Sequence, residues 1–430
     1  MEKLLPMTQG DIHARDSTFK RLKNQIEASP DIEERDKEIL LSGVSETPGF
    51  LSYMQNQGLS QSRINRYLRT WKRTLEREDW SIEEADKKKI TSYVGKLNTD
   101  QYCKKNGEPY SESTKREIKK GIRKMYIDYV DEHKSSLNFN EDFDPENLIT
   151  FTLTIERTFT DPDRLPTPYT VKTLVEQASR PRDKAYIMLL WSTGGRNGEI
   201  LGLKWRDVDF TGNIGKVTFR DTKTGGDHSV PMAEALPFMR QHKKSDPRSD
   251  EPGAYVFRSS QNDEQYSSNG AAEIINRARK DIPQKIKTNP HAFRKGRTSY
   301  WARQGQNETW ICKHMNWAPG SKIVRHYCRI AQENIEEGVS KHLGLYEQED
   351  EKDESKILTP SECHSCGRIN GFDTDTCIEC GEVLKASDLY NEAKIQEMKE
   401  EVKSEMIEQG LGKSREDVRN IAEQVVEEEF

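Results

Sequence analysis

The chain has 430 residues, a third of them charged, and a formal net charge of −6 at pH 7. This composition predicts a water-soluble protein of several domains, and without an apolar run of about 18 residues no membrane span is predicted. The opening sequence, MEKLLPMTQGDIHARD, lacks the apolar centre of a secretion signal, which favours a cytoplasmic location.

The charge is distributed unevenly along the chain. Residues 351–430 contain 10 Lys+Arg against 21 Asp+Glu, a net of −11, whereas residues 1–350 contain 57 against 52, a net of +5. An acidic C-terminal segment therefore masks a mildly basic body, and the body rather than the total indicates which partners are possible.

The N-terminal third is predicted to be helical, with a short helical arm over 1–34 and a helical domain over 35–135. SQSRINRYLRTWKRTL and STKREIKKGIRKMYIDYV both repeat apolar residues at helical spacing. The outer face of the second segment carries Lys115, Lys119 and Arg123. Such a basic face is either a solvated helix surface or a contact for the phosphate backbone of DNA.

A polar, acidic linker is predicted over 136–154, followed by a second domain over 155–348. TPYTVKTLVEQA and DKAYIMLLWSTGG predict helices, and NIGKVTFRDTKTGGDHSVPM predicts a β-hairpin with Gly225 and Gly226 in its turn. The fold class expected is mainly α (α+β): helical domains with one small antiparallel sheet.

Four separate stretches of this second domain carry candidate functional residues. In STGGRNGEILGLKW, a glycine pair ends one helix, Arg196 opens the next, and Glu199 is spaced to brace it. Lys223 lies at the tip of the hairpin. Taken singly, a surface arginine and a solvated lysine are the more common interpretations.

The other two stretches lie near the end of the domain. NPHAFRKGRTSYWARQG places His291 and Arg294 on one face of a helix, although its basic residues, Arg297 among them, also fit plain solvation. KHMNWAPGSKIVRHYCR places Trp317 before a helix break and Tyr327 ten residues later. Tyr300 and His314 are the nearest alternatives to Tyr327 and Trp317 as candidate functional residues.

In their order, these stretches resemble the catalytic motifs of the tyrosine recombinases, the phage integrase family, and its archaeal-type members most closely. The resemblance covers about residues 155–345, and residues 35–135 are more weakly similar to the core-binding domain of the family. Trp317 stands where many members have histidine. Asn316 stands where glycine is usual, which raises the question of how the local turn is formed.

The resemblance implies a site-specific DNA recombinase or integrase that forms a 3′-phosphotyrosine link through Tyr327. Guanidinium groups bind phosphate oxygens bidentately, which suits Arg196 and Arg294. Lys223 is expected to protonate the leaving 5′-oxygen and His291 to exchange the tyrosine proton. Trp317 is expected to donate a hydrogen bond to the phosphate. Double-stranded DNA, a tetramer on two duplexes and catalysis without a cofactor are implied by the family.

Four of the seven cysteines form two CxxCG motifs ten residues apart, CHSCG and CIECG. This spacing is typical of a zinc ribbon, predicted over 358–386, with Cys363, Cys366, Cys377 and Cys380 enclosing a structural Zn²⁺. An acidic helical tail is expected over 387–430, as a loosely held amphipathic helix rather than a coiled coil.

Two other functions remain open from the sequence. A type IB topoisomerase shares the same catalytic logic but relaxes DNA, and a non-catalytic regulator would use the zinc ribbon as its DNA-binding module. The target sequence of the DNA and the biological task of the recombination are not encoded in these motifs.

Overall fold

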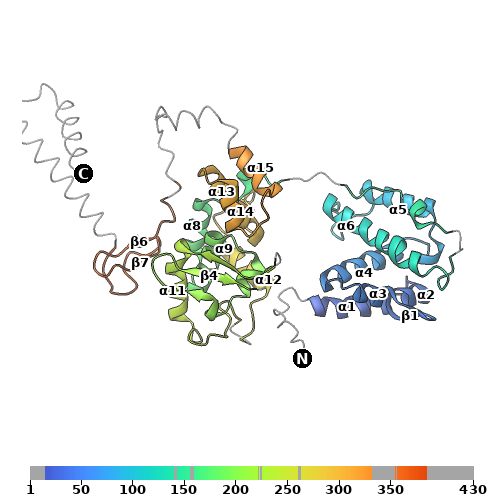
Figure 1. Ribbon diagram of the computed structural model, residues 1–430, viewed down its shortest axis with the longest axis horizontal. Helices are drawn as coiled ribbons and strands as arrows, with labels where there is room; N and C mark the ends of the chain where they lie inside the picture. The colour runs from blue at the N-terminus through green and yellow to red at the C-terminus, as the bar shows by residue number, and fades with distance from the viewer. Residues whose placement is uncertain are drawn as a thin grey trace, which may run out of the picture. The chain divides into compact units, whose positions relative to one another are not determined.

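The computed structural model describes residues 15–139, 143–154, 159–220, 222, 225–259, 263–331, 354 and 356–384. The chain divides into two compact units, Met1–Thr158 and Phe159–Phe430 (Figure 1). Both are mostly helical, as the sequence predicts, and small antiparallel sheets complete them. None of the described helices is long and apolar enough to cross a membrane.

The first unit consists of short helices and one two-stranded hairpin. Its elements are α1 (Arg15–Glu27), α2 (Glu34–Lys37), η1 (Glu38–Ser42), β1 (Gly43–Val44), β2 (Thr47–Pro48), α3 (Phe50–Asn56), α4 (Gln61–Leu75), η2 (Ile82–Glu84), α5 (Lys87–Asn98), α6 (Glu112–Arg123), η3 (Lys124–Val130) and α7 (Pro145–Leu148). Strand β1 pairs with β2 in antiparallel register.

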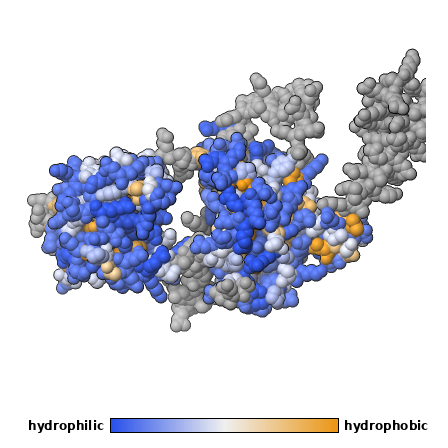
Figure 2. Space-filling model, turned by 180° about the vertical axis from the view of Figure 1, so that it is seen from behind, coloured by the Kyte–Doolittle hydropathy of each residue, from blue (hydrophilic) through white to orange (hydrophobic). Residues whose placement is uncertain are grey.

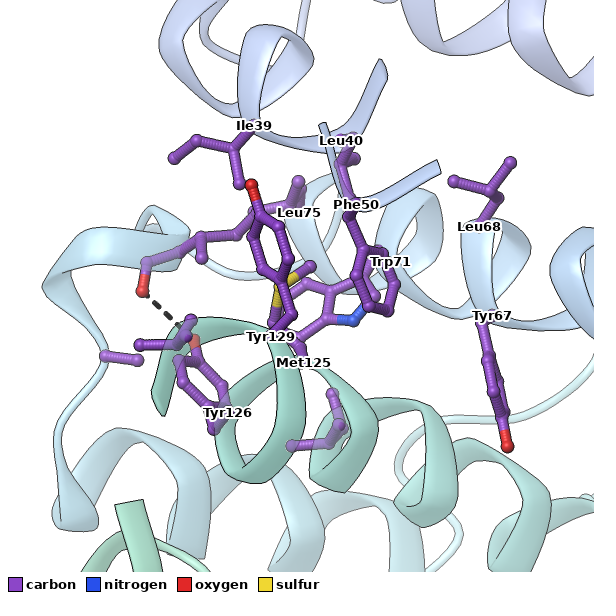
Figure 3. Packing of buried hydrophobic residues seen from close by; sticks show 14 of the residues in the cluster. Ile39, Leu40, Phe50, Tyr67, Leu68, Trp71, Leu75, Met125, Tyr126 and Tyr129 are labelled. Atoms are coloured by element: carbon purple, nitrogen blue, oxygen red, sulfur yellow. Dashed lines mark hydrogen bonds between the residues drawn. The ribbon is translucent and has the colours of Figure 1, made fainter. Parts of the chain in front are cut away.

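The core of this unit lies between α4 and the continuous segment formed by α6 and η3 (Figure 3). Trp71 of α4 packs edge-on against Tyr126 at a centroid distance of 5.6 Å, and its indole N–H donates to the carbonyl of Gly121 at 3.2 Å. Burial confirms the predicted inward faces of both helices: Ile64, Tyr67, Leu68, Trp71, Leu75, Ile118, Ile122, Met125, Tyr126 and Tyr129.

The first unit extends beyond the helical domain that the sequence delimits. Helix α1 packs on α4 and buries Leu22 and Ile26, although it begins in the segment expected as a separate arm. Leu137 and Leu148, from the segment expected as a linker, are buried in the same core. Isolated leucines in a polar stretch give no periodic signal, so only the folded core reveals that they belong to it.

The second unit contains the remaining helices and the three-stranded sheet. Its elements are η4 (Pro162–Arg164), α8 (Pro168–Gln177), α9 (Pro181–Thr193), α10 (Asn197–Leu201), η5 (Trp205–Asp207), β3 (Val208–Asp209), β4 (Lys216–Phe219), β5 (His228–Pro231), η6 (Ala233–Ala235), α11 (Leu236–Ser245), α12 (Ser268–Ala278), α13 (Pro290–Arg303), α14 (Glu308–His314), α15 (Lys322–Ala331), β6 (Ser361–Glu362) and β7 (Ile369–Asn370).

The predicted β-hairpin is confirmed as β4 and β5, which pair Phe219 with His228, and β3 adds a third strand beside β4. Gly225 and Gly226 both have positive φ, 90° and 71°, in the connection between the strands. Glycine adopts this left-handed backbone without steric cost, which explains the pair of glycines at this turn.

Helix α9 is the centre of the second unit. Every residue from 185 to 193 is buried, and α8, α11 and α13 pack around it. A helix that is apolar on all sides is stable only when other elements surround it. The helix ends at Gly194 in the left-handed conformation, and the chain then turns directly into Arg196.

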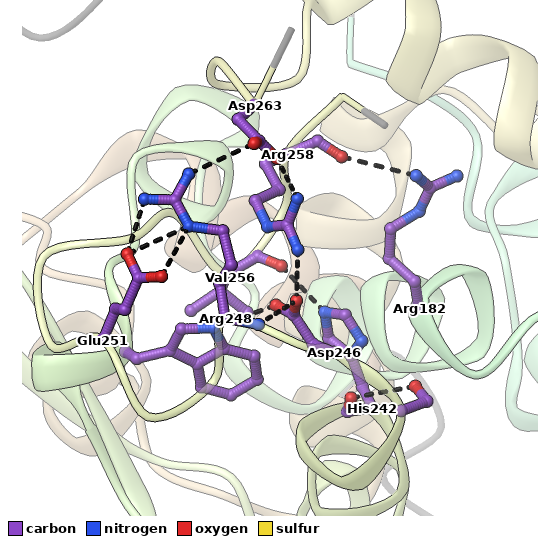
Figure 4. A network of polar contacts seen from close by, with 10 residues as sticks. Arg182, His242, Asp246, Arg248, Glu251, Val256, Arg258 and Asp263 are labelled. Carbon is purple, nitrogen blue, oxygen red and sulfur yellow. Dashed lines mark hydrogen bonds and ion pairs between the residues drawn. The ribbon is translucent and has the colours of Figure 1, made fainter. Parts of the chain in front are cut away.

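A polar network fixes the end of α11 to the loops that follow it (Figure 4). Asp246 accepts hydrogen bonds from the indole of Trp205 at 3.0 Å and from Arg258 at 2.5 Å. Burial alone would raise the pKa of Asp246, but the hydrogen bonds from the Arg248 amide, Arg258 and Trp205 lower it overall. The network therefore stabilises an ionised carboxylate inside the fold.

Candidate active site

Arg196 is held in place by Glu199. The backbone N–H of Arg196 donates to Glu199 Oε2 at 2.9 Å, and the Nη1 atom lies 2.5 Å from Oε1. The arginine side chain is 28% exposed and the glutamate 11%. One carboxylate thus fixes both the start of α10 and the guanidinium, whose remaining N–H groups are available to an anion.

Arg294 of α13 is buried, at 3% exposure. Its guanidinium donates to the carbonyl of Gly194 at 2.7 Å and to the carbonyl of Met315, and it lies 4.5 Å from the ring centroid of Trp317. Burial first, and then the charge of Arg196, lower the pKa of Arg294 to about 9. Two like charges held in a poorly solvated place favour the binding of an anion.

His291 lies one turn before Arg294 on the same helix and has access to solvent. Desolvation, then the charges of Lys295, Arg294 and Arg196, lower its pKa. A lowered pKa keeps the imidazole neutral near pH 7, so that one ring nitrogen can accept a proton. Trp317 is half-buried against Arg294, with its indole N–H able only to donate.

Tyr327 lies on α15, which packs on α13. The phenol is 2% exposed, and its hydroxyl donates to the carbonyl of Thr160 at 3.4 Å. The neighbouring His326 stacks on Phe159 at a centroid distance of 3.8 Å. Burial raises the pKa of Tyr327 to about 12. In this conformation the phenol is therefore protonated and covered by the segment that opens the second unit.

The turn after α14 joins the elements that carry the site. Asn316 has a φ of 49°, and its Nδ2 donates to Thr222 Oγ1 at 3.0 Å. His228 Nε2 lies 2.8 Å from the carbonyl of His314, and the Met315 carbonyl accepts from Arg294. Asparagine is among the few residues that adopt positive φ at low cost, which explains how the turn forms without glycine.

Lys223 lies outside the described residues, but Thr222 before it is held by this turn. The hydroxyl of Thr222 also donates to the carbonyl of Gly226 at 3.0 Å, and its amide N–H bonds the same carbonyl at 3.0 Å. The described part of the hairpin loop is thus connected to the Trp317 turn through Thr222.

The surroundings of the alternative residues His314 and Tyr300, and of Arg297, indicate structural roles. His314 Nε2 lies 3.2 Å from the carbonyl of Thr193, and burial, followed by the charge of Arg297, lowers its pKa to about 3. Tyr300 is buried beside Trp191. The interpretation of Arg297 as a solvated residue is wrong, because it is 6% exposed and donates to both carboxylate oxygens of Glu234 at 2.9 and 2.8 Å.

The basic face of α6 is only partly available to DNA. Lys115 is buried, and its ammonium is shared between Asp100 and Glu112, each at 2.9 Å. The expected phosphate contact of Lys115 is therefore withdrawn, because two carboxylates already occupy its donors. Lys119 is half-buried and Arg123 exposed, so contact with DNA stays a prediction for both.

A stripe of arginines on α4 was missed by the sequence analysis. The stripe consists of Arg66, Arg69 and Arg73, and it lines a groove together with Arg116 and with Arg77, which follows the end of the helix. Burial, then the charges of Arg73, Arg21 and Arg66, lower the pKa of Arg69. The spacing of three and four residues could have revealed the stripe, because it places all three side chains along one side of the helix.

The cysteine cluster could hold a metal ion. The Sγ atoms of Cys363, Cys366, Cys377 and Cys380 all lie within 4.8 Å of one another. Two of their separations are 3.6 Å, close to the edge of about 3.8 Å expected for a tetrahedron with Zn–S bonds of about 2.3 Å.

The two halves of the cluster have the same backbone turn. The Gly367 amide donates to the Cys363 carbonyl at 2.8 Å, and the Gly381 amide to the Cys377 carbonyl at 2.9 Å. Both glycines have positive φ, 68° and 76°. The amide of Arg368 also donates to the sulfur of Cys366, as Asn370 does to Cys377. These turns direct thiolates and amide N–H groups to a common centre, the donor set of a closed site.

Arg196, His291 with Arg294, Trp317 and Tyr327 follow one another in this order on helical elements of the second unit. Residues 167–334 match the phage integrase family.

Two relatives are similar over parts of their length. A probable integrase/recombinase protein of Methanocaldococcus jannaschii is 30% identical over 135 residues, which cover 30% of this chain and 40% of the relative. The tyrosine recombinase XerA of Pyrococcus furiosus is 28% identical over 189 residues, 42% of this chain and 63% of the relative. The chain thus spans less than two thirds of the length of either relative.

The solved structures matched by this chain include three recombinases. XerH bound to a difH substrate has a TM-score of 0.49 at 14% identity, covering 79% of this chain and 99% of that one. A lambda integrase dimer bound to a core site has 0.48 at 15%, covering 65% and 75%. XerA recombinase has 0.33 at 20%, covering 68% and 96%.

Proposed function

We propose that this chain is a site-specific DNA recombinase that cleaves and rejoins strands through a 3′-phosphotyrosine intermediate. The observation that carries the proposal is that Arg196 lies close enough to Arg294 for its charge to lower the pKa of Arg294. Arg294 donates to two carbonyl oxygens, and Glu199 forms its hydrogen bonds with Arg196. Two cations and one carboxylate leave a net positive charge, which a phosphodiester would complement.

The reaction requires no energy cofactor. The Tyr327 oxygen would attack the phosphorus, a bond to the 3′-phosphate would form, and the bond to the 5′-oxygen would break. His291 would accept the phenol proton, and Lys223 would protonate the leaving 5′-oxygen. Arg196 and Arg294 would bind the charge that develops on the phosphate oxygens. Attack by a 5′-hydroxyl of another strand would reverse these steps and exchange the strands.

Cleavage would be preceded by a movement of α15. Tyr327 is covered and protonated while its hydroxyl bonds the Thr160 carbonyl. A hydroxyl that is covered and bonded to the Thr160 carbonyl has no access to a phosphate, so DNA binding would have to release this contact.

Double-stranded DNA is the proposed substrate for both units. The arginine stripe of α4, together with Lys119 and Arg123, would bind the phosphate backbone and lend affinity without sequence information. Exchange between two duplexes would need four copies of the chain, one for each cleaved strand. A protein with this function would be located on the DNA of the cell.

We also infer that the cysteine cluster takes a structural Zn²⁺. Four thiolates fill a tetrahedral shell and leave no position for water, so the ion would cross-link the fold rather than catalyse. Metal analysis of the purified chain should give one zinc per chain, and replacement of Cys366 and Cys380 by serine should abolish it.

The proposed function is tested with a nicked suicide duplex whose sequence comes from the DNA flanking the gene. We expect a covalent protein–DNA adduct that is lost in Tyr327→Phe and in Arg196→Ala. Tyr300→Phe is the matched control and should still form the adduct. An adduct that persists in Tyr327→Phe would overturn the assignment of the nucleophile.

The alternatives are separated by the products. A type IB topoisomerase would relax supercoiled plasmid in the absence of a specific site, whereas a recombinase would form junctions between two site-bearing duplexes. A regulator would bind DNA with equal affinity in wild type and Tyr327→Phe and give no adduct in either.

A further inference from the structure

The cysteine ribbon lies against the catalytic part of the second unit. Figure 1 shows β6 and β7 beside α11. Phe372 packs on Phe238 of α11 at a centroid distance of 5.5 Å, and Asp373 Oδ2 lies 2.5 Å from Lys184 Nζ of α9. Residues 371–373, named here the docking loop, therefore contact both central helices.

The contact is closely packed. Phe238 is 1% exposed, and the side chain of Asp373 is 5% exposed. A Cβ atom at Gly371 would lie 2.8 Å from Phe238 Cζ, so only glycine fits at this point. Within the described part of the chain, Asp373 Oδ1 has no hydrogen-bond partner, and the carboxylate therefore depends on Lys184. A buried charge without its partner is costly.

The docking loop is shaped by the cysteine cluster. It lies in the segment that connects Cys366 of the first CxxCG motif to Cys377 of the second. Asn370, immediately before the loop, is fully buried. Its side chain donates to the carbonyl of Arg368 at 2.8 Å and to Cys377 Sγ at 3.6 Å, and accepts from the Ile378 amide at 3.1 Å. The position of the loop thus depends on the distance between the two halves of the cluster.

The other faces of the ribbon offer little that could hold it together without a cross-link. Its strands β6 and β7 have two residues each, and Val383 is 50% exposed. Figure 2 shows hydrophobic residues gathered at this end of the second unit, in contrast to the hydrophilic surface elsewhere in that view. So small a module cannot bury enough apolar surface to fold alone and needs a metal or a neighbour.

We propose that the ribbon is a metal-dependent support of the catalytic unit. With a metal in the cysteine cluster, the docking loop holds Lys184 and Phe238 and so stabilises α9 and α11. Without it, the halves of the cluster separate, the loop leaves its seat, and the two helices lose this cover. Because α9 ends at the turn into Arg196, metal loading would determine the rigidity of the helix that positions the site. The proposal rests on the zinc inference and not on the recombinase chemistry.

The experiment compares the full chain with zinc bound and after chelation. Zinc content is measured by metal analysis, and hydrogen exchange is followed in peptides of α9 and α11. We expect one zinc per chain, and exchange in both peptides to become about ten-fold faster after chelation, which equals about 1.4 kcal/mol of lost protection. Zinc added back should restore the slow exchange.

Two variants separate docking from metal binding. Asp373→Asn and Lys184→Met should keep one zinc per chain and show fast exchange in α9, the helix that carries Lys184, even with zinc bound. Lys172→Met is the control, because Lys172 of α8 forms an exposed ion pair with Glu176 at 3.9 Å. Exposed ion pairs contribute little to stability compared with the buried pair of Lys184 and Asp373. This variant should behave as the wild type.

The outcomes distinguish the two inferences. A chain that binds one zinc but shows the same exchange in α9 and α11 after chelation would overturn the docking proposal alone. A chain that binds no zinc under any condition would overturn the zinc inference and, with it, the metal dependence of docking. Slow exchange in α9 of both variants would also contradict the assigned contact between Asp373 and Lys184.

Discussion

Replacement of Asn316 should slow DNA cleavage by displacing the hairpin loop that carries Lys223, rather than by weakening the phosphate contacts of Arg196 and Arg294. Asn316 Nδ2 donates to Thr222 Oγ1 at 3.0 Å, next to Lys223 in the sequence. A side-chain hydrogen bond contributes about 0.5–1.5 kcal/mol net. If this bond fixes the loop in its productive position, its loss should slow cleavage about two- to twelve-fold, since about 1.4 kcal/mol corresponds to a factor of ten.

Two substitutions at this position separate the side chain from the backbone. Asn316 has a φ of 49°. Glycine adopts this conformation freely, whereas alanine there is strained by about 1 kcal/mol. Both Asn316→Gly and Asn316→Ala should therefore cleave more slowly by a similar factor, but the alanine variant should unfold at a lower temperature than the glycine variant, because only alanine is strained at this φ.

The assay uses a duplex in which sulfur replaces the leaving 5′-oxygen at the cleavage site. A thiol, with a pKa of about 8.5 in cysteine, is a far better leaving group than an alcohol and needs no proton donor. The sulfur substrate should therefore restore normal cleavage by Asn316→Gly and by Lys223→Ala. Arg196→Ala should remain inactive on it, because the phosphate charge is still unbound.

Two results would refute this reasoning. Cleavage of the ordinary duplex by Asn316→Gly at the wild-type rate would show that the contact with Thr222 does not position the loop. A defect of equal size on the sulfur substrate would show that Asn316 acts on a step other than protonation of the leaving group.

Three other predictions concern stability and DNA affinity. Burial raises the pKa of Asp36 to about 6, so the folded state favours the neutral carboxyl. The first unit should therefore lose about 1–3 kcal/mol of stability as the pH rises from about 4 to about 6. Asp36→Asn should flatten this dependence in hydrogen exchange of the full chain, and an unchanged slope would contradict the cause. Replacing Arg69 and Arg73 by glutamine should weaken DNA binding and reduce the salt slope by about one per lost phosphate contact, whereas the buried Lys115→Gln should leave that slope unaltered. Glu234→Gln should lower the unfolding free energy by about 3 kcal/mol, because it leaves a buried guanidinium unpaired, and a loss below about 0.5 kcal/mol would show that solvent compensates.

Helical periodicity and local motifs could be read from the sequence because their physics is local. The inward face of α4 follows from side chains three and four residues apart, and the hairpin follows from alternation and two glycines. The CxxCG turns are likewise complete within five residues each. The order of the four candidate motifs can also be read without a structure, because each motif lies within a short continuous stretch of the chain.

Partners far apart along the chain were decided only by the folded structure. Lys115 and Arg297 have the same appearance in the sequence as Arg123, but the first two are buried against carboxylates that the tertiary fold places beside them. A charge is a surface feature or a core ion pair according to its neighbours in space, and those neighbours are not local.

The sequence by itself thus determined the helical class, the motif order with Tyr327 and its arginines, and the cysteine cluster. The tertiary structure decided that Tyr327 is covered by Thr160, 167 residues earlier, and that the ribbon seats on α9 and α11. The physical reason is range: helix propensity and turn geometry act over a few residues, whereas burial and ion pairing depend on segments that meet only when the chain has folded.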